Sequence, residues 1–404
     1  MGDPHASRPA TDCHALVDQL LLEQGRVEPL ELLLAADLLA YEDYEAWRLG
    51  QRRDLEGALQ IAREEAAELL NRAADYARGQ RLASSVLQYR GWGAADQLLS
   101  IGSHAALAAA CALAFAPPAD RAQLDLFQDS SAALAEEAIC CALSERRAET
   151  ARQQVTHLMQ KDPRHPRLGG YLRLIQAIDE SVDAERVDRP EARLDDLEEV
   201  ERLAQQILGQ RARDFVAPLW AAVARQFSGR PFDPACPQLH ASHAWARASR
   251  WDAVRAAVEA ESAWRDQPEL VLRHAEACWR RRHVAVARRD WMWLCWEHPP
   301  AAERAFAAQS FPDRRLCDFW RRFGDLDQEL ATEDFPAWLL LAEPGAAAAV
   351  PADAAPADEG GAAYRLLHAL VTGQDSIAQR QALSEIHPRL LQLYVARRAG
   401  RPER

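Results

Sequence analysis

Apolar residues recur along most of the chain at the spacing of an α-helix. Between residues 148 and 178 two such stripes follow each other, separated by the proline-containing break DPRHPR. Positions three or four residues apart lie on one face of a helix, which then needs an apolar neighbour. The two stripes consist of Ala148, Ala151, Val155 and Leu158, then Leu168, Leu172, Ile175 and Ile178. The chain carries no convincing run of alternating β-branched residues, so we predict an all-α fold.

One helical segment is repeated 31 residues further along the chain. HAWARASRWDAVRAAVEAESAWRDQP, from His243 to Pro268, can be aligned with HAEACWRRRHVAVARRDWMWLCWEHP, from His274 to Pro299. The first helix of each copy carries small residues and a proline closes the second, which is typical of stacked helical hairpins. The matched pairs are His243 with His274, Ala244 with Ala275, Ala246 with Ala277, Ala256 with Ala287, and Pro268 with Pro299.

These two copies, and ALAEEAICCALSERRAETARQQVTHLMQKDPRHP before them, resemble degenerate tetratricopeptide repeats, whose usual period is about 34 residues. The resemblance covers roughly residues 130–180 and 213–310. It implies a tetratricopeptide-like α-solenoid whose concave surface binds another protein. The W-x2-L-G-x2-Y signature of the family is missing, so a different array of helical hairpins is the alternative.

Composition divides the chain into five segments. Pro117-Pro118 ends one helical group, and AEPGAAAAVPADAAPADEGGAA interrupts the helical pattern near the C-terminus. Alanine- and proline-rich sequence of this kind is typical of a flexible tether. We predict an N-terminal helical region at 1–116, a linker at 117–130, a helical-repeat region at 131–341, a flexible tether at 342–363 and C-terminal helices at 364–404.

The charge and the cysteines limit the functions that the chain can have. Its formal net charge is −13, and Lys161 is its only lysine, so nearly all the positive charge is arginine, as a GC-rich genome favours. An acidic chain does not favour tracking of duplex DNA, which needs a basic face. The cysteines form no CxxC pair, and the longest apolar run, 105–117, is too short to span a bilayer. We expect a cytoplasmic protein with no membrane segment and no direct contact with nucleic acid.

The predicted linker contains the pentapeptide QLDLF, residues 123–127. It resembles the short consensus by which bacterial polymerases and repair proteins dock on the β sliding clamp: glutamine, leucine, serine or aspartate, leucine, phenylalanine. The resemblance implies that Gln123 bonds at the rim of a cleft, that Leu124 packs nearby, and that Leu126 and Phe127 fill an apolar pocket, with Asp125 at the tolerant position. The alternative is that the three apolar side chains cover the end of two helical hairpins.

Two groups of residues carry metal-ligand chemistry. Asp195-Asp196-Leu197-Glu198-Glu199 superficially resembles the aspartate-rich motif of all-α terpenoid synthases, in which carboxylates such as Asp195 and Glu199 would hold magnesium. The second metal motif of those enzymes is not found, and a solvated, acidic helix start is the alternative. In CPQLHASH, Cys236, His240 and His243 offer zinc ligands, with His274 and Cys278 from the next hairpin. The alternative is that they are core residues with satisfied hydrogen bonds.

In one further segment arginines are followed closely by tryptophans. RRRHVAVARR, from Arg280 to Arg289, precedes WMWLCWEHP with Trp291, Trp293 and Trp296. Such a segment can form a stacking surface for single strands or a groove for acidic peptides, whereas tryptophans at helical spacing also form a core.

Taken together, these patterns predict a non-catalytic scaffold or adaptor protein, recruited to the sliding clamp through Gln123, Leu124, Asp125, Leu126 and Phe127. The sequence assigns it no catalytic residue, cofactor or metal. The rivals are an all-α enzyme or metal-binding protein that uses Asp195 and Glu199, or Cys236, His240 and His243, and a nucleic-acid-binding protein that uses Arg280–Arg289.

Overall fold

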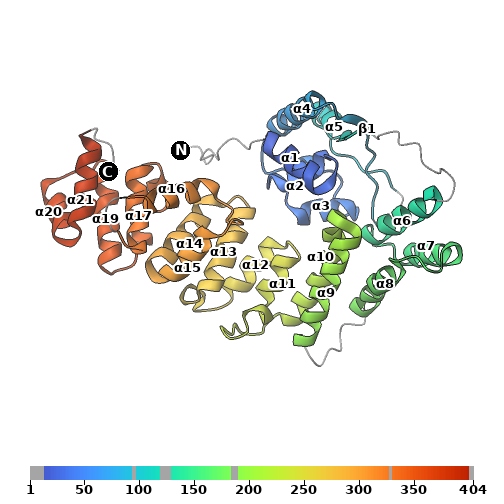
Figure 1. The fold of residues 1–404 in the computed structure, drawn as a ribbon. Helices are drawn as coiled ribbons and strands as arrows, with labels where there is room; N and C mark the ends of the chain where they lie inside the picture. The colour runs from blue at the N-terminus through green and yellow to red at the C-terminus, as the bar shows by residue number, and fades with distance from the viewer. Residues whose placement is uncertain (1–12, 93–96, 119–128, 183–189, 327–329, 400–404) are drawn as a thin grey trace. The chain divides into compact units, whose positions relative to one another are not determined.

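The computed structural model describes residues 13–92, 97–118, 129–182, 190–326 and 330–399, and helices dominate it (Figure 1). The predicted all-α class is confirmed. Contacts within the chain divide it into two compact units, the N-terminal unit Met1–Arg250 and the C-terminal unit Trp251–Arg404. The boundary falls inside the predicted repeat region 131–341, and each unit is described by itself.

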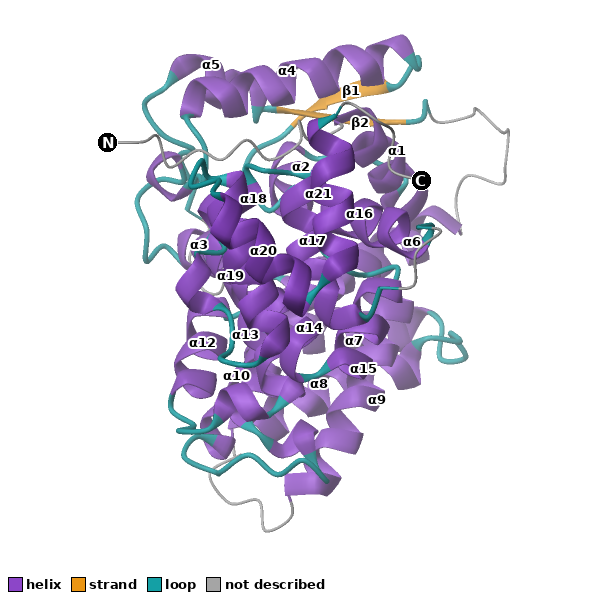
Figure 2. Ribbon diagram, turned by 90° about the vertical axis from the view of Figure 1, so that its left-hand side faces the viewer, coloured by secondary structure: helices purple, strands orange, loops and turns teal. Residues whose placement is uncertain are grey.

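The N-terminal unit begins with a helical group around a small sheet. Strands β1 (Ala83–Val86) and β2 (Leu113–Ala116) form an antiparallel pair, and Figure 2 shows this pair beside α4. The sheet is a correction to the sequence prediction, because four-residue strands are too short to show an alternating pattern. Buried apolar side chains of the helices, among them Leu33, Trp47 and Leu70, form the core. The helices of this group are α1 (Cys13–Gln24), α2 (Pro29–Ala35), α3 (Tyr41–Arg48), α4 (Arg63–Gly79) and α5 (Ala105–Ala110).

A second group of helices completes this unit: α6 (Asp129–Ser144), α7 (Ala148–Lys161), α8 (Leu168–Val182), α9 (Pro190–Leu208), α10 (Ala212–Phe227) and α11 (Ala241–Arg247). The predicted stripe of α7 is buried at Ala151, Val155 and Leu158, and the helix ends at the exposed Lys161. In α8 the buried face is turned from the predicted one. Leu172 is 48% exposed, and Tyr171 takes its place in the core.

The C-terminal unit contains α12 (Trp251–Glu259), α13 (Pro268–Arg280), α14 (Val284–Glu297), α15 (Pro299–Ala307), α16 (Arg314–Gly324), α17 (Phe335–Ala342), α18 (Ala346–Ala349), α19 (Glu359–Val371), α20 (Ile377–Ile386) and α21 (Pro388–Arg398). Prolines start several of these helices, because the first turn needs no backbone donor. Trp291, Trp296, Phe335, Trp338 and Tyr364 are buried and contribute an aromatic core.

The same turn ends α6, α11 and α13. Arg146, Ser249 and Arg282 each adopt a left-handed conformation, with φ of 62°, 56° and 65°. In each turn the N–H of this residue and the N–H of the residue after it donate hydrogen bonds to carbonyls of the last turn of the helix, which is the Schellman arrangement. It reverses the chain within three residues, so α6 lies beside α7 and α13 beside α14 (Figure 1).

The two copies of the internal repeat are buried at only some of their aligned positions. Ala244 and Ala275 are both buried, as the alignment predicts. Ala256 is exposed, however, whereas its counterpart Ala287 is fully buried. The two copies therefore share local helical structure without sharing every packing position.

The alanine- and proline-rich segment 342–363 is folded, so the prediction of a flexible tether is wrong. It forms α18, a short 3-10 helix at Ala352–Ala354 and the start of α19. Ala346, Ala347 and Val350 are buried, and the Tyr364 hydroxyl donates a 2.6 Å hydrogen bond to the carbonyl of Val350. Small side chains let this backbone approach the neighbouring helices closely, an effect that composition alone does not reveal.

Candidate functional site

A pocket of about 530 Å³ lies in the C-terminal unit between the end of α12, the loop that follows it, and helices α13 and α14. Its wall includes Glu259, Trp264, His274 and Cys278, together with arginines from several elements. The pocket therefore brings together a carboxylate, an imidazole and a thiol.

His274 is the centre of this group. Its Nδ1 lies 2.6 Å from Oδ2 of Asp290, and its Nε2 lies 3.1 Å from Oε1 of Glu259. The ring of Trp264 packs on the imidazole with 4.5 Å between centroids. Both ring nitrogens are thus engaged, which fixes the orientation of the imidazole.

Cys278 lies one helical turn after His274 on α13, so the two side chains share a face. Its Sγ lies 3.8 Å from Nδ1 of the imidazole, and Asp290 approaches the same nitrogen from α14. Each of these three residues is at most 3% exposed. Within the described parts of the chain, this is the group whose three ligand atoms lie within 4.8 Å of one another, as a metal ion requires. We call His274, Cys278, Asp290 and Glu259 the histidine cluster.

Opposing effects set the protonation of His274. Burial lowers its pKa, but the hydrogen bonds to Asp290 and Cys278 outweigh burial and raise the pKa to about 10. The hydrogen bond from His274 also lowers the pKa of Glu259. An imidazolium therefore bridges two carboxylates at neutral pH.

The arrangement does not match a nucleophilic triad. In a triad, the nucleophile and the orienting carboxylate occupy opposite nitrogens of the imidazole. Here each nitrogen is bonded to a carboxylate, Nδ1 to Asp290 and Nε2 to Glu259, and Sγ of Cys278 lies 3.8 and 4.0 Å from the two nitrogens. The geometry fits metal ligation better than acyl transfer.

The zinc ligands expected in CPQLHASH are not brought together. His240 caps α11, with its Nδ1 2.8 Å from Oγ of Ser242, and His243 meets the ring of Trp220 edge-on. Cys236 is half-buried and belongs to no three-ligand group of the described residues. That part of the hypothesis is wrong, because these side chains serve caps and packing instead.

The sequence did name His274 and Cys278, but it missed Asp290. A usable signal was present, since Asp290 is a lone carboxylate directly before the apolar run WMWLCW on a helix. A carboxylate at such a position is buried and needs a partner.

Asp195 and Glu199 are exposed on α9. Their neighbour Asp196 forms an ion pair with Arg173 of α8. This is the arrangement of a solvated acidic helix face, the alternative to the magnesium motif.

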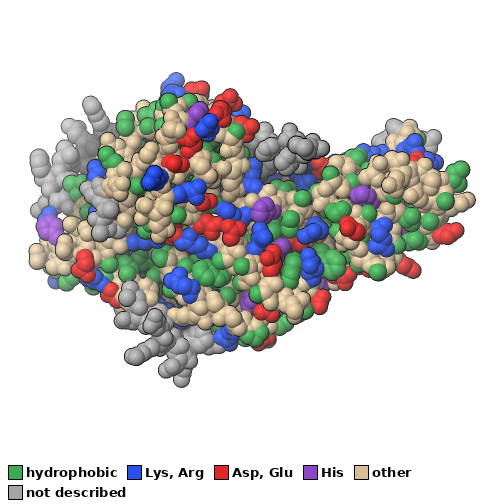
Figure 3. Space-filling model, turned by 180° about the vertical axis from the view of Figure 1, so that it is seen from behind, with side chains coloured by type: hydrophobic (Ala, Val, Ile, Leu, Met, Phe, Trp, Pro, Cys, Tyr) green, Lys and Arg blue, Asp and Glu red, His purple; other side chains and the backbone are tan. Residues whose placement is uncertain are grey.

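The arginines from Arg280 to Arg289 are largely paired with carboxylates. Arg281 lies 3.1 Å from Asp252, and Arg288 lies 2.9 Å from Asp313. On the face drawn in Figure 3, basic and acidic side chains are interspersed. Trp291 and Trp296 are buried, so these tryptophans form core rather than a stacking surface.

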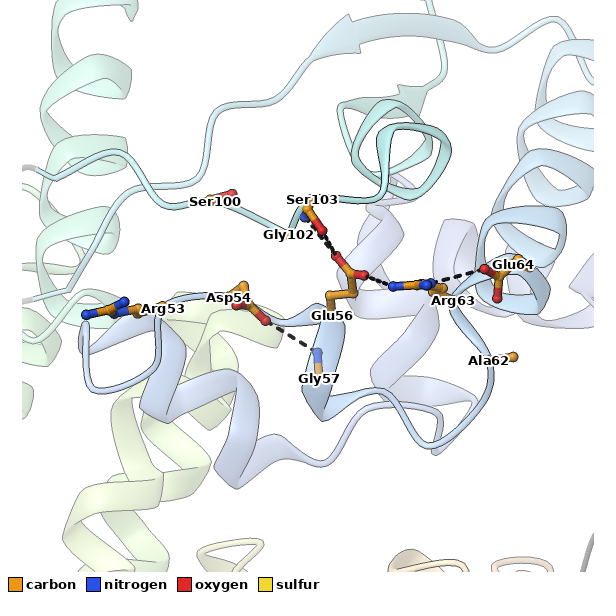
Figure 4. A pocket seen from close by; sticks show the side chains of 10 residues that line it. All are labelled: Arg53, Asp54, Glu56, Gly57, Ala62, Arg63, Glu64, Ser100, Gly102 and Ser103. Atoms are coloured by element: carbon orange, nitrogen blue, oxygen red, sulfur yellow. Dashed lines mark hydrogen bonds and ion pairs between the residues drawn. The ribbon is translucent and has the colours of Figure 1, made fainter.

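A larger pocket, of about 720 Å³, lies in the N-terminal unit around Glu56 (Figure 4). The carboxylate accepts hydrogen bonds from Arg63 at 2.6 Å and from the backbone N–H groups of Ser103 and His104 at 2.7 and 3.1 Å. These bonds lower the pKa of Glu56 to about 2, the bond from Arg63 most of all. Because the protein itself supplies these donors, Glu56 holds the loop before α5 in place.

A buried network of charges also lies in the N-terminal unit, beside a cavity of about 440 Å³. Glu45, only 2% exposed, forms ion pairs with both Arg146 and Arg250. Nearby, Asp214 accepts a 3.0 Å hydrogen bond from the Tyr41 hydroxyl, and burial raises its pKa to about 6. We call Glu45, Arg146 and Arg250 the arginine cluster.

Gln123, Leu124, Asp125, Leu126 and Phe127 lie outside the described residues. None of the described helices is both long and apolar enough to cross a membrane. Comparisons with protein-family models, curated proteins and solved structures found no match to this chain.

Proposed function

We propose that the protein is a non-catalytic interaction scaffold that is recruited to the bacterial β sliding clamp through residues 123–127. The observation that carries the proposal is the pentapeptide QLDLF itself, in which every position agrees with the docking consensus. A clamp partner works in DNA replication or repair, which places the protein in the cytoplasm.

The position of the motif supports this proposal. In the sequence the pentapeptide follows Pro117-Pro118, and a proline disfavours helical structure at the residue before it. Docking of a short peptide needs a segment that is not committed to a helix. The helical hairpins that follow it, such as α6 and α7, would then carry the surface that binds a second protein.

The test is a titration of the full-length protein against a purified bacterial β clamp, followed by calorimetry. We expect saturable binding in the micromolar range that the double variant Leu126→Ala, Phe127→Ala abolishes. Asp125→Ser is the matched control, because serine also occurs at this position of the consensus, and it should bind like the wild type.

Circular dichroism of each variant accompanies the titration. If the wild type does not bind, or if the double variant binds as well as the wild type, the clamp proposal is wrong. A double variant that loses helicity would instead show that Leu126 and Phe127 are part of the core.

A further inference from the structure

We propose that His274, Cys278 and Asp290 form a zinc site that fastens α13 to α14. The proposal is independent of clamp docking, so either one can fail alone. Imidazole, thiolate and carboxylate are all zinc ligands, and all three are buried here within 4.8 Å of one another.

A tetrahedral site would need shifts of the Cys278 and Asp290 side chains. Bond lengths to zinc of about 2.0–2.3 Å place a nitrogen and a sulfur ligand about 3.5 Å apart. The distance from Nδ1 of His274 to Sγ of Cys278 is 3.8 Å. The 2.6 Å contact from Nδ1 to Oδ2 of Asp290 is a hydrogen bond, and the carboxylate would have to move away by about 0.7 Å to become a ligand. A small rotation of the Asp290 side chain achieves this.

Glu259 supplies the outer support that zinc-bound histidines have. Such a histidine usually donates its other N–H to a carboxylate, which fixes the ring and raises its basicity. Nε2 of His274 lies 3.1 Å from Oε1 of Glu259, and Nδ1 lies 2.6 Å from Oδ2 of Asp290. Sγ of Cys278 is nearly equidistant from the two nitrogens, 3.8 Å from Nδ1 and 4.0 Å from Nε2. The ring thus already directs Nδ1 to one ligand and Nε2 to the supporting carboxylate, and a rotation of the Cys278 side chain would bring its sulfur to the Nδ1 side.

The ion can reach this site from the pocket. His274 and Cys278 line the pocket wall, whereas Asp290 lies behind them and is only 1% exposed. A water molecule from the pocket can serve as the fourth ligand. Binding of Zn²⁺ displaces the thiol proton of Cys278 and the proton on Nδ1 of His274 to solvent, and no oxidation or reduction occurs.

A purely structural ion bridge is the competing description. In it, a protonated His274 joins Asp290 to Glu259, and Cys278 stays a protonated thiol beside the ring. The two descriptions therefore differ in what they require of Cys278, and this residue decides between them.

The experiment uses the full-length protein, stripped of metal with a chelator and titrated with Co²⁺ as a spectroscopic probe for zinc. We expect one equivalent of Co²⁺ to produce a thiolate-to-cobalt charge-transfer band and the visible bands of tetrahedral cobalt, which Zn²⁺ then removes. Cys278→Ser should lose the charge-transfer band. The matched controls are Cys295→Ser, a buried cysteine of α14, and Cys236→Ser, the cysteine of CPQLHASH; both should keep it.

A second variant covers the outcome in which Cys278→Ser does not fold. The Glu259 side chain is 48% exposed, so Glu259→Gln leaves the core intact. It should weaken cobalt binding by about 10–100-fold, because it removes the support of the ring. Glu276→Gln, on α13 and of similar exposure, should have no effect.

Three results would overturn the zinc site. They are the absence of a one-equivalent cobalt spectrum in the wild type, persistence of the charge-transfer band in Cys278→Ser, and its loss in Cys236→Ser.

Discussion

The arginine cluster of the N-terminal unit and the histidine cluster of the C-terminal unit solve the same physical problem with different chemistry. In each, a carboxylate that is almost inaccessible to solvent is paired with a cation. Glu45 is 2% exposed and Asp290 is 1% exposed. A buried carboxylate without a partner would be strongly destabilising, so both cations are structurally necessary.

The cations differ in what else they can do. A guanidinium keeps its proton at every physiological pH and has no lone pair for a metal. An imidazole can lose its proton and then bind a metal ion through the free nitrogen. The arginine cluster can therefore only hold helices together. The histidine cluster can in addition lose a proton and exchange it for a metal ion.

The largest expected effect is that of breaking the arginine cluster. Glu45→Ala leaves Arg146 and Arg250 without their shared carboxylate. Since neither can lose its charge, we expect the free energy of unfolding of the N-terminal unit to fall by about 3–5 kcal/mol. Urea denaturation followed by tryptophan fluorescence measures this, and a loss within error of zero would contradict the structural role of the cluster.

The corresponding change in the histidine cluster should cost less. Asp290→Asn removes the buried charge that faces His274, but His274 can respond by losing its proton. We expect the free energy of unfolding to fall by about 1–3 kcal/mol, which is the cost of a weakened buried hydrogen bond. The same denaturation experiment, carried out without metal, checks it. A loss as large as that of Glu45→Ala would mean that His274 does not relieve its charge by losing its proton.

Asp214→Asn should stabilise the protein at neutral pH. The folded state raises the pKa of Asp214 from 3.8 to about 6, because it is buried, so the native state holds this proton more tightly than the unfolded chain. Stability from this group is present at low pH and falls as pH rises through this window. We expect the free energy of unfolding of the variant to exceed that of the wild type by on the order of 1–2 kcal/mol at pH 8. This is less than the energy that corresponds to the whole pKa shift, because Arg213 loses the charge of Asp214.

The gain from Asp214→Asn should disappear below about pH 4, where the wild-type carboxyl is protonated in both states. Unfolding curves at several pH values separate this effect from a general change in packing. A gain in the free energy of unfolding that does not vary with pH would contradict the raised pKa of Asp214.

Tyr41→Phe tests the smallest contribution. It removes the hydroxyl that donates to Asp214 and keeps the ring, which packs on the guanidinium of Arg213 with 4.6 Å to the centroid. We expect a loss of about 1 kcal/mol, as for a typical buried hydrogen bond. In the Asp214→Asn background the loss should be smaller, which a double-mutant cycle measures.

The helices could be predicted because their signal is local. Ala151, Val155 and Leu158 follow one another at helical spacing, and all are buried. Leu172 fits the same spacing but is exposed, because the neighbouring helices decide which face of α8 is covered. Strand β2 follows a helix within one alanine-rich run, and its identity depends on pairing with β1, far away in the sequence.

Only part of the candidate site, the pair on α13, could be predicted from the sequence. His274 and Cys278 stand four residues apart on one helix, so their proximity is readable from the sequence. Asp290 joins them across the α13–α14 hairpin, and its position depends on the length of the turn and on the rotation of both helices. The ligands expected from Cys236 to His243 failed for the converse reason, because nearness in sequence did not make their side chains converge.

The exposed Lys161 at the end of α7 has a practical consequence. Since the other basic side chains are guanidinium or imidazole groups, an amine-reactive ester finds a single lysine to acylate. Once the more acidic α-amino group of the chain has been blocked near neutral pH, a fluorophore can be attached at this one helix end, with every cysteine left untouched. The chain brings its own labelling site for observing single molecules.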